Sequence, residues 1–249
     1  MKTAVGRGIT AMLAVILLAA PASAEFSILI YFGKQLTGKG SLHLKQGDTD
    51  LDFRGVRWKE QSFKNPVFYG VRASYWFDRM RGWGAALDFT HAKTILAEKD
   101  IVAVGGSHRG FPVDGREAVS DTIKRFELTH GLNLLTLNGL HRWFAAGRRG
   151  QSPPGPLQCY TALGAGFSIP HVEAHIGDQW TGRYQPAAGP VLNGMLGVDY
   201  DFTRVLSGVL EYKLSYSAVH ALLNGGGFID AKTFNHQFVS GLAGTIPHW

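Results

Sequence analysis

The residues best suited to chemistry stand in a single short run, His171-Val172-Glu173. Side chains two residues apart on a strand point to the same side, so the imidazole and the carboxylate can share a proton or a metal ion. His91 ends another strand-like segment and is expected to complete either arrangement from across the sheet. Rim histidines hydrogen-bonded to loops are the structural alternative, because a histidine and carboxylate cluster is a weak motif by itself.

Further ionisable residues are expected to approach the same rim. Asp88 is an additional catalytic candidate, although a salt bridge to Arg72 inside a barrel is the first interpretation of an inward carboxylate. Glu211 and Lys213 are expected to extend such an inner ionic network. The substrate-binding candidates are the polar and charged residues of the rim and inner face: Arg72, Lys93, His130, Asn133, Glu211 and Lys213.

The segment that best shows how these groups are positioned is Gly82–Lys93, GWGAALDFTHAK. Apolar residues alternate there with small or polar ones, which is the period-2 pattern of a strand with two unlike faces. One face has Trp83, Ala85, Leu87 and Phe89, and the other has Gly84, Ala86, Asp88 and Thr90. Large apolar residues outside and small or polar ones inside are typical of a narrow transmembrane β-barrel.

Similar segments recur along the chain and predict eight antiparallel strands in an all-β fold. They cover residues 25–35, 66–78, 82–93, 125–143, 157–169, 187–202, 205–217 and 233–246. The first, third, fifth and seventh connections are expected to be long and polar, the second and sixth very short, and the fourth an irregular turn. Alternating long and short connections indicate an up-and-down outer-membrane barrel. The Leu134-Leu135 pair is expected to break the alternation of the fourth strand.

The N-terminal residues predict export. Residues 1–24 combine basic Lys2 and Arg7, an apolar run and the cleavage-site pattern Ala22-Ser23-Ala24, which together indicate a signal peptide. Residues 25–249 are then one barrel domain, and the 32 Gly, 15 Phe, 8 Tyr and 6 Trp agree with it. On an exported chain, a net charge of +6 favours an anionic membrane surface such as lipopolysaccharide, not nucleic acid.

Several blocks in order resemble the lipid A oxidases of rhizobial and related bacteria. They are YGVRASYW (69–76), GAALDFTHAK (84–93), HGLNLLTLN (130–138), GAGFSIPHVE (164–173) and EYK (211–213). The resemblance implies an outer-membrane enzyme that uses O2 to convert the proximal glucosamine of lipid A to 2-aminogluconate, with H2O2 as co-product. It also implies a substrate that lacks the phosphate at position 1, and help from a divalent metal.

Within that hypothesis, His91, His171 and Glu173 supply the base or hold the metal. The sequence has no dinucleotide-binding, P-loop or haem-attachment motif, so no organic cofactor is expected. The expected partners are lipid A, lipopolysaccharide and outer-membrane lipids, and the chain is expected to act as a monomer. Two alternatives stay open: a non-catalytic OmpA-type barrel, and a lipid A deacylase, for which Ser168 is poorly placed because its phase is inward.

Overall fold

The computed structural model describes residues 25–77, 80, 82–144 and 157–246. These residues form antiparallel strands and one short 3-10 helix, η1 (Val119–Asp121), which confirms the all-β prediction. The predicted signal peptide, most of the 79–81 turn, the 145–156 connection and the last three residues lie outside the described part. In the part that is described, no helix has the length and apolarity to cross a membrane.

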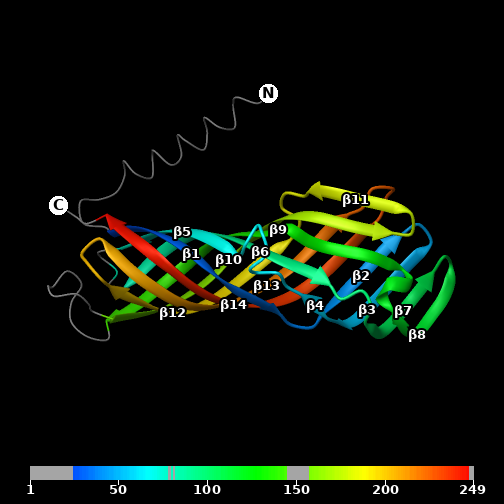
Figure 1. Cartoon of the computed structure of the whole chain (residues 1–249), viewed down its shortest axis with the longest axis horizontal. Coiled ribbons are helices and arrows are strands. Elements are labelled where there is room, and N and C mark those ends of the chain that lie inside the picture. Colours follow the sequence, from blue (N-terminus) through cyan, green and yellow to red (C-terminus); the bar gives the residue numbers. More distant parts are fainter. Residues whose placement is uncertain (1–24, 78–79, 81, 145–156, 247–249) are drawn as a thin grey trace, which may run out of the picture.

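Eight long strands close into a barrel, as the sequence predicts (Figure 1). Strand β14 pairs with β1 from Phe26 opposite Ile246 to Thr37 opposite Asn235, so the ladder has no open edge along this length. In order around the barrel, the strands are β1 (Glu25–Thr37), β5 (Tyr69–Trp76), β6 (Trp83–Leu96), β9 (Ile123–Phe144), β10 (Leu157–Ile176), β12 (Pro190–Asp201), β13 (Leu206–Leu222) and β14 (Phe228–Ile246).

The outer wall of the barrel carries a band of exposed apolar side chains. On β6 the alternation is as predicted, since Leu87 is 52% exposed whereas Ala86 and Asp88 are buried. The neighbouring strands continue the band with Ile28, Ile30, Phe32, Leu137, Leu163, Leu196, Leu210, Phe238 and Leu242. A closed barrel with a continuous apolar exterior is stable when lipid covers that exterior, so this band is the membrane-spanning surface.

Inside the barrel, four charged side chains form a neutral network of two cations and two anions. Arg72 Nε donates to Asp88 Oδ2 over 2.6 Å, and its two terminal nitrogens donate to Glu211 over 2.6 and 2.7 Å. Lys213 Nζ lies 3.1 Å from Asp88 Oδ1. The hydroxyl of Tyr31 donates to Asp88 over 2.7 Å, which leaves the buried carboxylate well satisfied. The predicted inner ionic network is therefore confirmed.

Beyond the apolar band, the barrel wall continues into a second, mostly extracellular layer of strands. These are β2 (Gly40–Gln46), β3 (Thr49–Val56), β4 (Trp58–Lys59), β7 (Ile101–His108), β8 (Phe111–Ala118) and β11 (Gln179–Tyr184), at the right in Figure 1. The sequence predicts polar loops here, which is wrong. The inner faces of β2, β3 and β7 supply a core of apolar side chains: Leu42, Leu44, Leu51, Phe53, Val102 and Val104.

Several strand ends also differ from the prediction. Strands β13 and β14 continue until only residues 223–227 separate them, so the seventh connection is short. Strand β10 runs on to Ile176 and carries the His171 to Glu173 run within it. In β9, Leu134 points inward and Leu135 outward, so the alternation continues through this pair. The irregularity lies nearer the extracellular end, between Leu128 and Leu132, where β9 shifts register against β6.

The lumen network predicts a large cost for removing one of its anions. The change Glu211→Gln leaves Arg72 and Lys213 facing Asp88 alone, and an uncompensated buried charge costs about 3–5 kcal/mol. Urea unfolding of the protein refolded into lipid vesicles measures this loss of unfolding free energy. The control is Lys45→Ala, which removes an exposed ion pair with Asp50 worth roughly 0–1 kcal/mol. Equal losses in the two variants would refute a stabilising role for the network.

Candidate functional site

Two imidazoles and a carboxylate meet at the extracellular ends of β9 and β10. They belong to His130, His171 and Glu173, whose ligand-type atoms all lie within 4.8 Å of one another. Nδ1 of His130 is hydrogen-bonded to Oε1 of Glu173, and Nδ1 of His171 lies 3.7 Å from the same oxygen. Among the residues that the structure describes, this is the one group of at least three such side chains with metal-binding spacing.

Neighbouring residues hold the cluster in place. Arg125 Nη2 lies 3.0 Å from Glu173 Oε2 and holds this carboxylate oxygen in place. The other oxygen, Oε1, faces the two histidines. The Tyr184 hydroxyl donates to the backbone carbonyl of His130 over 3.0 Å. The Tyr184 ring also packs edge-on against His171, with ring centroids 4.7 Å apart. Strand β11 therefore supports both histidines from the side, as outer-shell partners of reactive groups commonly do.

A bulge in β9 brings His130 to the cluster. Pro170 and Glu173 of β10 pair with Leu132 and Glu127 of β9, so β9 has two more residues than β10 over this stretch. Gly131 has φ +133°, a conformation that L side chains rarely adopt. Bulges re-aim side chains, and this one directs His130 outward, where its side chain is 62% exposed.

The cluster lies on the outer wall, directly above the lipid-facing band. Along β10 the outward positions run through exposed Leu163 and Phe167 to His171. On β6 and β9 the outward positions likewise change from Phe89 and Leu135 to the polar pair His91 and Asn133. The change from apolar to polar side chains marks the height of lipid head groups, so the cluster faces the membrane interface instead of the barrel lumen.

His91 lies on this wall but does not complete the cluster. Its Nδ1 is hydrogen-bonded to Asn133 Oδ1 over 2.8 Å, and its ring stacks on Tyr69 with centroids 4.9 Å apart. Asn133 in turn donates to the carbonyl of Ile169 over 3.1 Å. His130 takes the place that the sequence analysis assigns to His91, because the bulge adds residues that strand periodicity alone does not reveal. Gly131, which follows His130, is the feature of the sequence that could have indicated the bulge.

The remaining predicted site residues are enclosed. Four of them belong to the lumen network and not to the rim: Asp88, Arg72, Glu211 and Lys213. Their side chains point inward, and they lie at the level of the apolar band. The cavity beside Arg72 measures only about 30 Å³, close to the space of one water molecule.

Lys93 is buried too. Its Nζ donates to the backbone carbonyls of Lys64 and Asn65 over 3.0 and 3.1 Å. It therefore anchors the segment before β5, and an extracellular substrate does not reach it.

The electrostatic environment favours the neutral form of His171. Burial lowers the pKa of His171, and the neighbouring His130 lowers it further, whereas Glu173 acts in the opposite direction. Its Nδ1 is buried and has no hydrogen-bond partner among the described residues. A neutral imidazole with an unused nitrogen beside a carboxylate is suited to binding a metal ion, because metals bind the deprotonated ring. The donor set of two histidines and one carboxylate therefore fits a divalent transition metal.

Comparisons with known proteins find similarity in solved structures alone. No protein-family model and no curated protein matches the chain. Neisserial surface protein A is 11% identical, with 89% of this chain and 98% of that chain covered and a TM-score of 0.39. The outer membrane protein OprG from Pseudomonas aeruginosa is 13% identical, with 90% of this chain and 96% of that chain covered and a TM-score of 0.43. Ail of Yersinia pestis is 15% identical, with 87% of this chain and 99% of that chain covered and a TM-score of 0.32.

The closed ladder and the apolar exterior of the chain agree with one location. A β-barrel of eight antiparallel strands with lipid-facing residues outside and charges inside is the architecture of the Gram-negative outer membrane. The protein is an integral outer-membrane β-barrel.

Metal binding tests the cluster directly. We expect the refolded protein to bind one Co²⁺, with an absorption band in the visible region. The changes His130→Ala, His171→Ala and Glu173→Gln should each weaken binding by about tenfold or more, because each removes one ligand. His43→Ala is the matched control, since this histidine lies on β2, outside the cluster, and is hydrogen-bonded to Asp52 over 2.9 Å. Equal binding by the cluster variants and the control would contradict the assignment.

Gly131 provides a second test of the same geometry. A Cβ at this position would lie 2.7 Å from the side-chain amide of Asn133, in a backbone conformation unfavourable to alanine. Gly131→Ala should therefore move His130 and weaken Co²⁺ binding, while the barrel still shows its heat-modifiable shift on gel electrophoresis. Gly105→Ala is the control, because a Cβ there meets no atom within 4 Å. Unchanged Co²⁺ binding by Gly131→Ala would show that the bulge does not position His130.

Proposed function

We propose that this protein is a lipid A oxidase, which uses O2 to convert the proximal glucosamine of lipid A to 2-aminogluconate and releases H2O2. The observation that carries the proposal is the position of His130, His171 and Glu173 on the outer wall where the apolar band ends. In an outer leaflet, acyl chains cover such a band and the sugars of lipid A lie just above it. The cluster is therefore at the height of the reacting sugar.

The reaction defines what the site must do. Oxidation of the hemiacetal carbon removes one hydrogen from carbon and one from the anomeric hydroxyl, and O2 accepts both to become H2O2. Water then opens the resulting lactone, so the product has one oxygen atom more than the substrate. A proton acceptor must lie beside the anomeric hydroxyl. His130 and Glu173 share a hydrogen bond, so a proton taken here is held between the imidazole and the carboxylate.

The surroundings supply space and contacts for a sugar. Tyr184, which packs on His171, also lines a cavity of about 490 Å³ with Arg183, Gln185 and His220. That volume is within the usual range for small-ligand sites. On the lipid side of the cluster, Asn133 presents a polar side chain on the same wall, whereas the ring of His91 beside it is buried. Substrate contacts in this proposal therefore come from β9 and β11, and the enclosed lumen residues act only in folding.

A divalent metal fits the same residues. His130, His171 and Glu173 would hold it, and Arg125 would keep Glu173 in place through the second carboxylate oxygen. When bound, a redox-active metal at two histidines and one carboxylate supplies activation of O2. The divalent cation that the family resemblance implies is consistent with this donor set.

The two alternatives predict other outcomes: a deacylase releases a fatty acid, and a non-catalytic barrel leaves lipid A unchanged. A deacylase needs a nucleophile at the interface, but Ser168 is fully buried on the inner face and its hydroxyl donates to the Gly189 carbonyl over 3.4 Å. An OmpA-type barrel without activity gives no reason for a bulge that carries a histidine to a carboxylate. We therefore favour the oxidase.

Mass spectrometry of lipid A tests the proposal. The refolded protein is incubated in air with lipid A that lacks the 1-phosphate, with and without chelator. We expect a gain of one oxygen, loss of this gain with chelator, and loss of at least about a hundredfold in rate in His171→Ala and Glu173→Gln, as for essential acid–base or metal-ligand groups. His43→Ala, on β2 and outside both the cluster and the cavity lined by Tyr184, should keep the wild-type rate. Retained oxidation in both cluster variants would overturn the assignment of the site, and loss of an acyl chain would identify a deacylase.

A further inference from the structure

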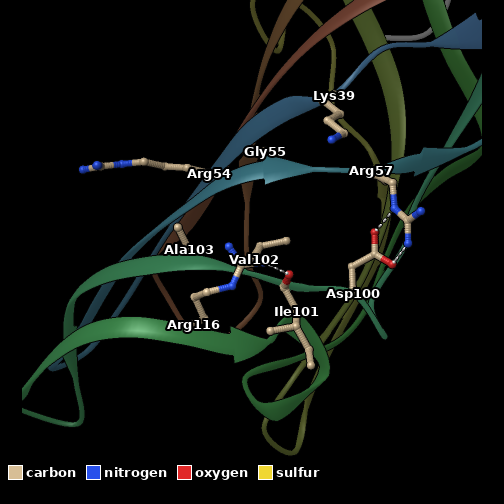
Figure 2. A pocket seen from close by; sticks show the side chains of 9 residues that line it. All are labelled: Lys39, Arg54, Gly55, Arg57, Asp100, Ile101, Val102, Ala103 and Arg116. Atoms are coloured by element: carbon tan, nitrogen blue, oxygen red, sulfur yellow. Dashed lines mark hydrogen bonds and ion pairs between the residues drawn. The ribbon is translucent and has the colours of Figure 1, made fainter.

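A second polar site lies on the extracellular layer, formed by strands that do not contribute to the histidine cluster. A cleft of about 390 Å³ lies between the membrane-side ends of β3, β7 and β8, and its lining side chains are drawn in Figure 2. Its charged lining consists of Lys39, Arg54, Arg57, Arg116 and one carboxylate, Asp100. Four cations against one anion leave a net charge of +3 in a space the size of a small-ligand site.

The single carboxylate neutralises only one of these cations. Arg57 donates to both oxygens of Asp100 over 2.6 and 2.5 Å, in the two-point geometry drawn in Figure 2. The hydrogen bonds from Arg57 hold the pKa of Asp100 below its usual range, and the positive charges of Lys59 and Lys39 lower it further. Asp100 is therefore ionised and committed to Arg57, and it does not compensate the rest of the cleft.

The other cations remain available to a ligand. In the described structure, no hydrogen bond or ion pair joins the side chain of Lys39 or Arg54 to another residue, and both residues are exposed. Arg116 Nη2 donates a hydrogen bond to the Ile101 carbonyl over 3.1 Å. This bond orients the guanidinium and leaves its other N–H groups unused. Guanidinium groups bind phosphate and carboxylate through paired hydrogen bonds, so this arrangement is suited to anions.

The position of the cleft indicates which anions it meets. Lys39 lies two residues beyond the end of β1 at Thr37, and Arg54 and Ile101 lie at the membrane-side ends of β3 and β7. The cleft is therefore just above the apolar band, where the outer leaflet presents sugars that carry phosphate and carboxylate groups. Ile101 is 62% exposed at the edge of the cleft and offers an apolar surface for a sugar ring.

We propose that this cleft binds an anionic saccharide, with phosphate or carboxylate groups on its sugars, such as the inner core of a neighbouring lipopolysaccharide. The site is separate from the histidine cluster, because β3, β7 and β8 form it whereas β9, β10 and β11 form the cluster. In Figure 1, β7 and β8 are at the lower right and β11 is along the upper edge. Binding here does not require that the protein oxidises lipid A, and it would attach the barrel to the surrounding glycolipid layer.

Calorimetry with the detergent-solubilised full chain tests the proposal. One probe is the phosphorylated, carboxylated core oligosaccharide released from lipopolysaccharide, which lacks lipid A and so is no oxidase substrate. The second is intact lipopolysaccharide in nanodiscs, and neutral maltotriose is the blank. We expect saturable binding of both anionic probes, weakened about tenfold or more in Lys39→Gln/Arg54→Gln, because two unpaired cations are lost.

The matched control is Lys45→Gln/Arg109→Gln, which removes the same charge from the same extracellular layer but outside the cleft. It should change affinity by no more than about twofold, as expected for exposed, screened charges. Equal weakening in the two double variants would overturn the proposal, because a diffuse positive surface would then explain binding. Binding of the nanodisc probe alone would also overturn it, since acyl chains and not sugar anions would be the ligand.

Discussion

The hydrogen-bond ladder between β1 and β14 is the constraint on which the rest of this structure depends. It runs from Phe26 opposite Ile246 to Thr37 opposite Asn235 and closes the sheet on itself. In lipid an unpaired strand edge would leave backbone groups without any partner, so closure is what permits the apolar exterior. Closure also creates a narrow interior, and the side chains that fill it decide where chemistry can take place.

The interior is filled by charges that satisfy one another. Arg72, Asp88, Glu211 and Lys213 come from β5, β6 and β13, and Tyr31 and Tyr160 add hydroxyl hydrogen bonds from β1 and β10. This network links five of the barrel strands and leaves a cavity of only about 30 Å³ beside it. Above it, the inner faces of the extracellular strands form an apolar core. The filled interior leaves the outside of the barrel as the accessible surface, where the histidine cluster and the basic cleft are both found.

The extracellular layer gives the barrel two distinct surfaces at the membrane interface. On one, the bulge before Leu132 brings His130 of β9 to Glu173 of β10, and β11 supports the pair. On the other, β3, β7 and β8 hold several cations around a single carboxylate. Both surfaces begin where apolar outward positions end, so both are at the height of glycolipid head groups. The proposed oxidase site and the proposed anion-binding cleft therefore lie at one height.

The period-2 pattern by itself determined the eight barrel strands, their faces and the inward phase of Arg72, Asp88, Glu211 and Lys213, because alternation depends only on neighbouring residues. Tertiary structure decided which histidine meets Glu173. His130 replaces His91 there because the irregularity at Gly131 changes the register of β9 against both neighbours, and register is a property of strand pairs. The polar segments also became strands only when a core existed for Leu42 and Phe53 to cover, since their sequence alone resembles loops.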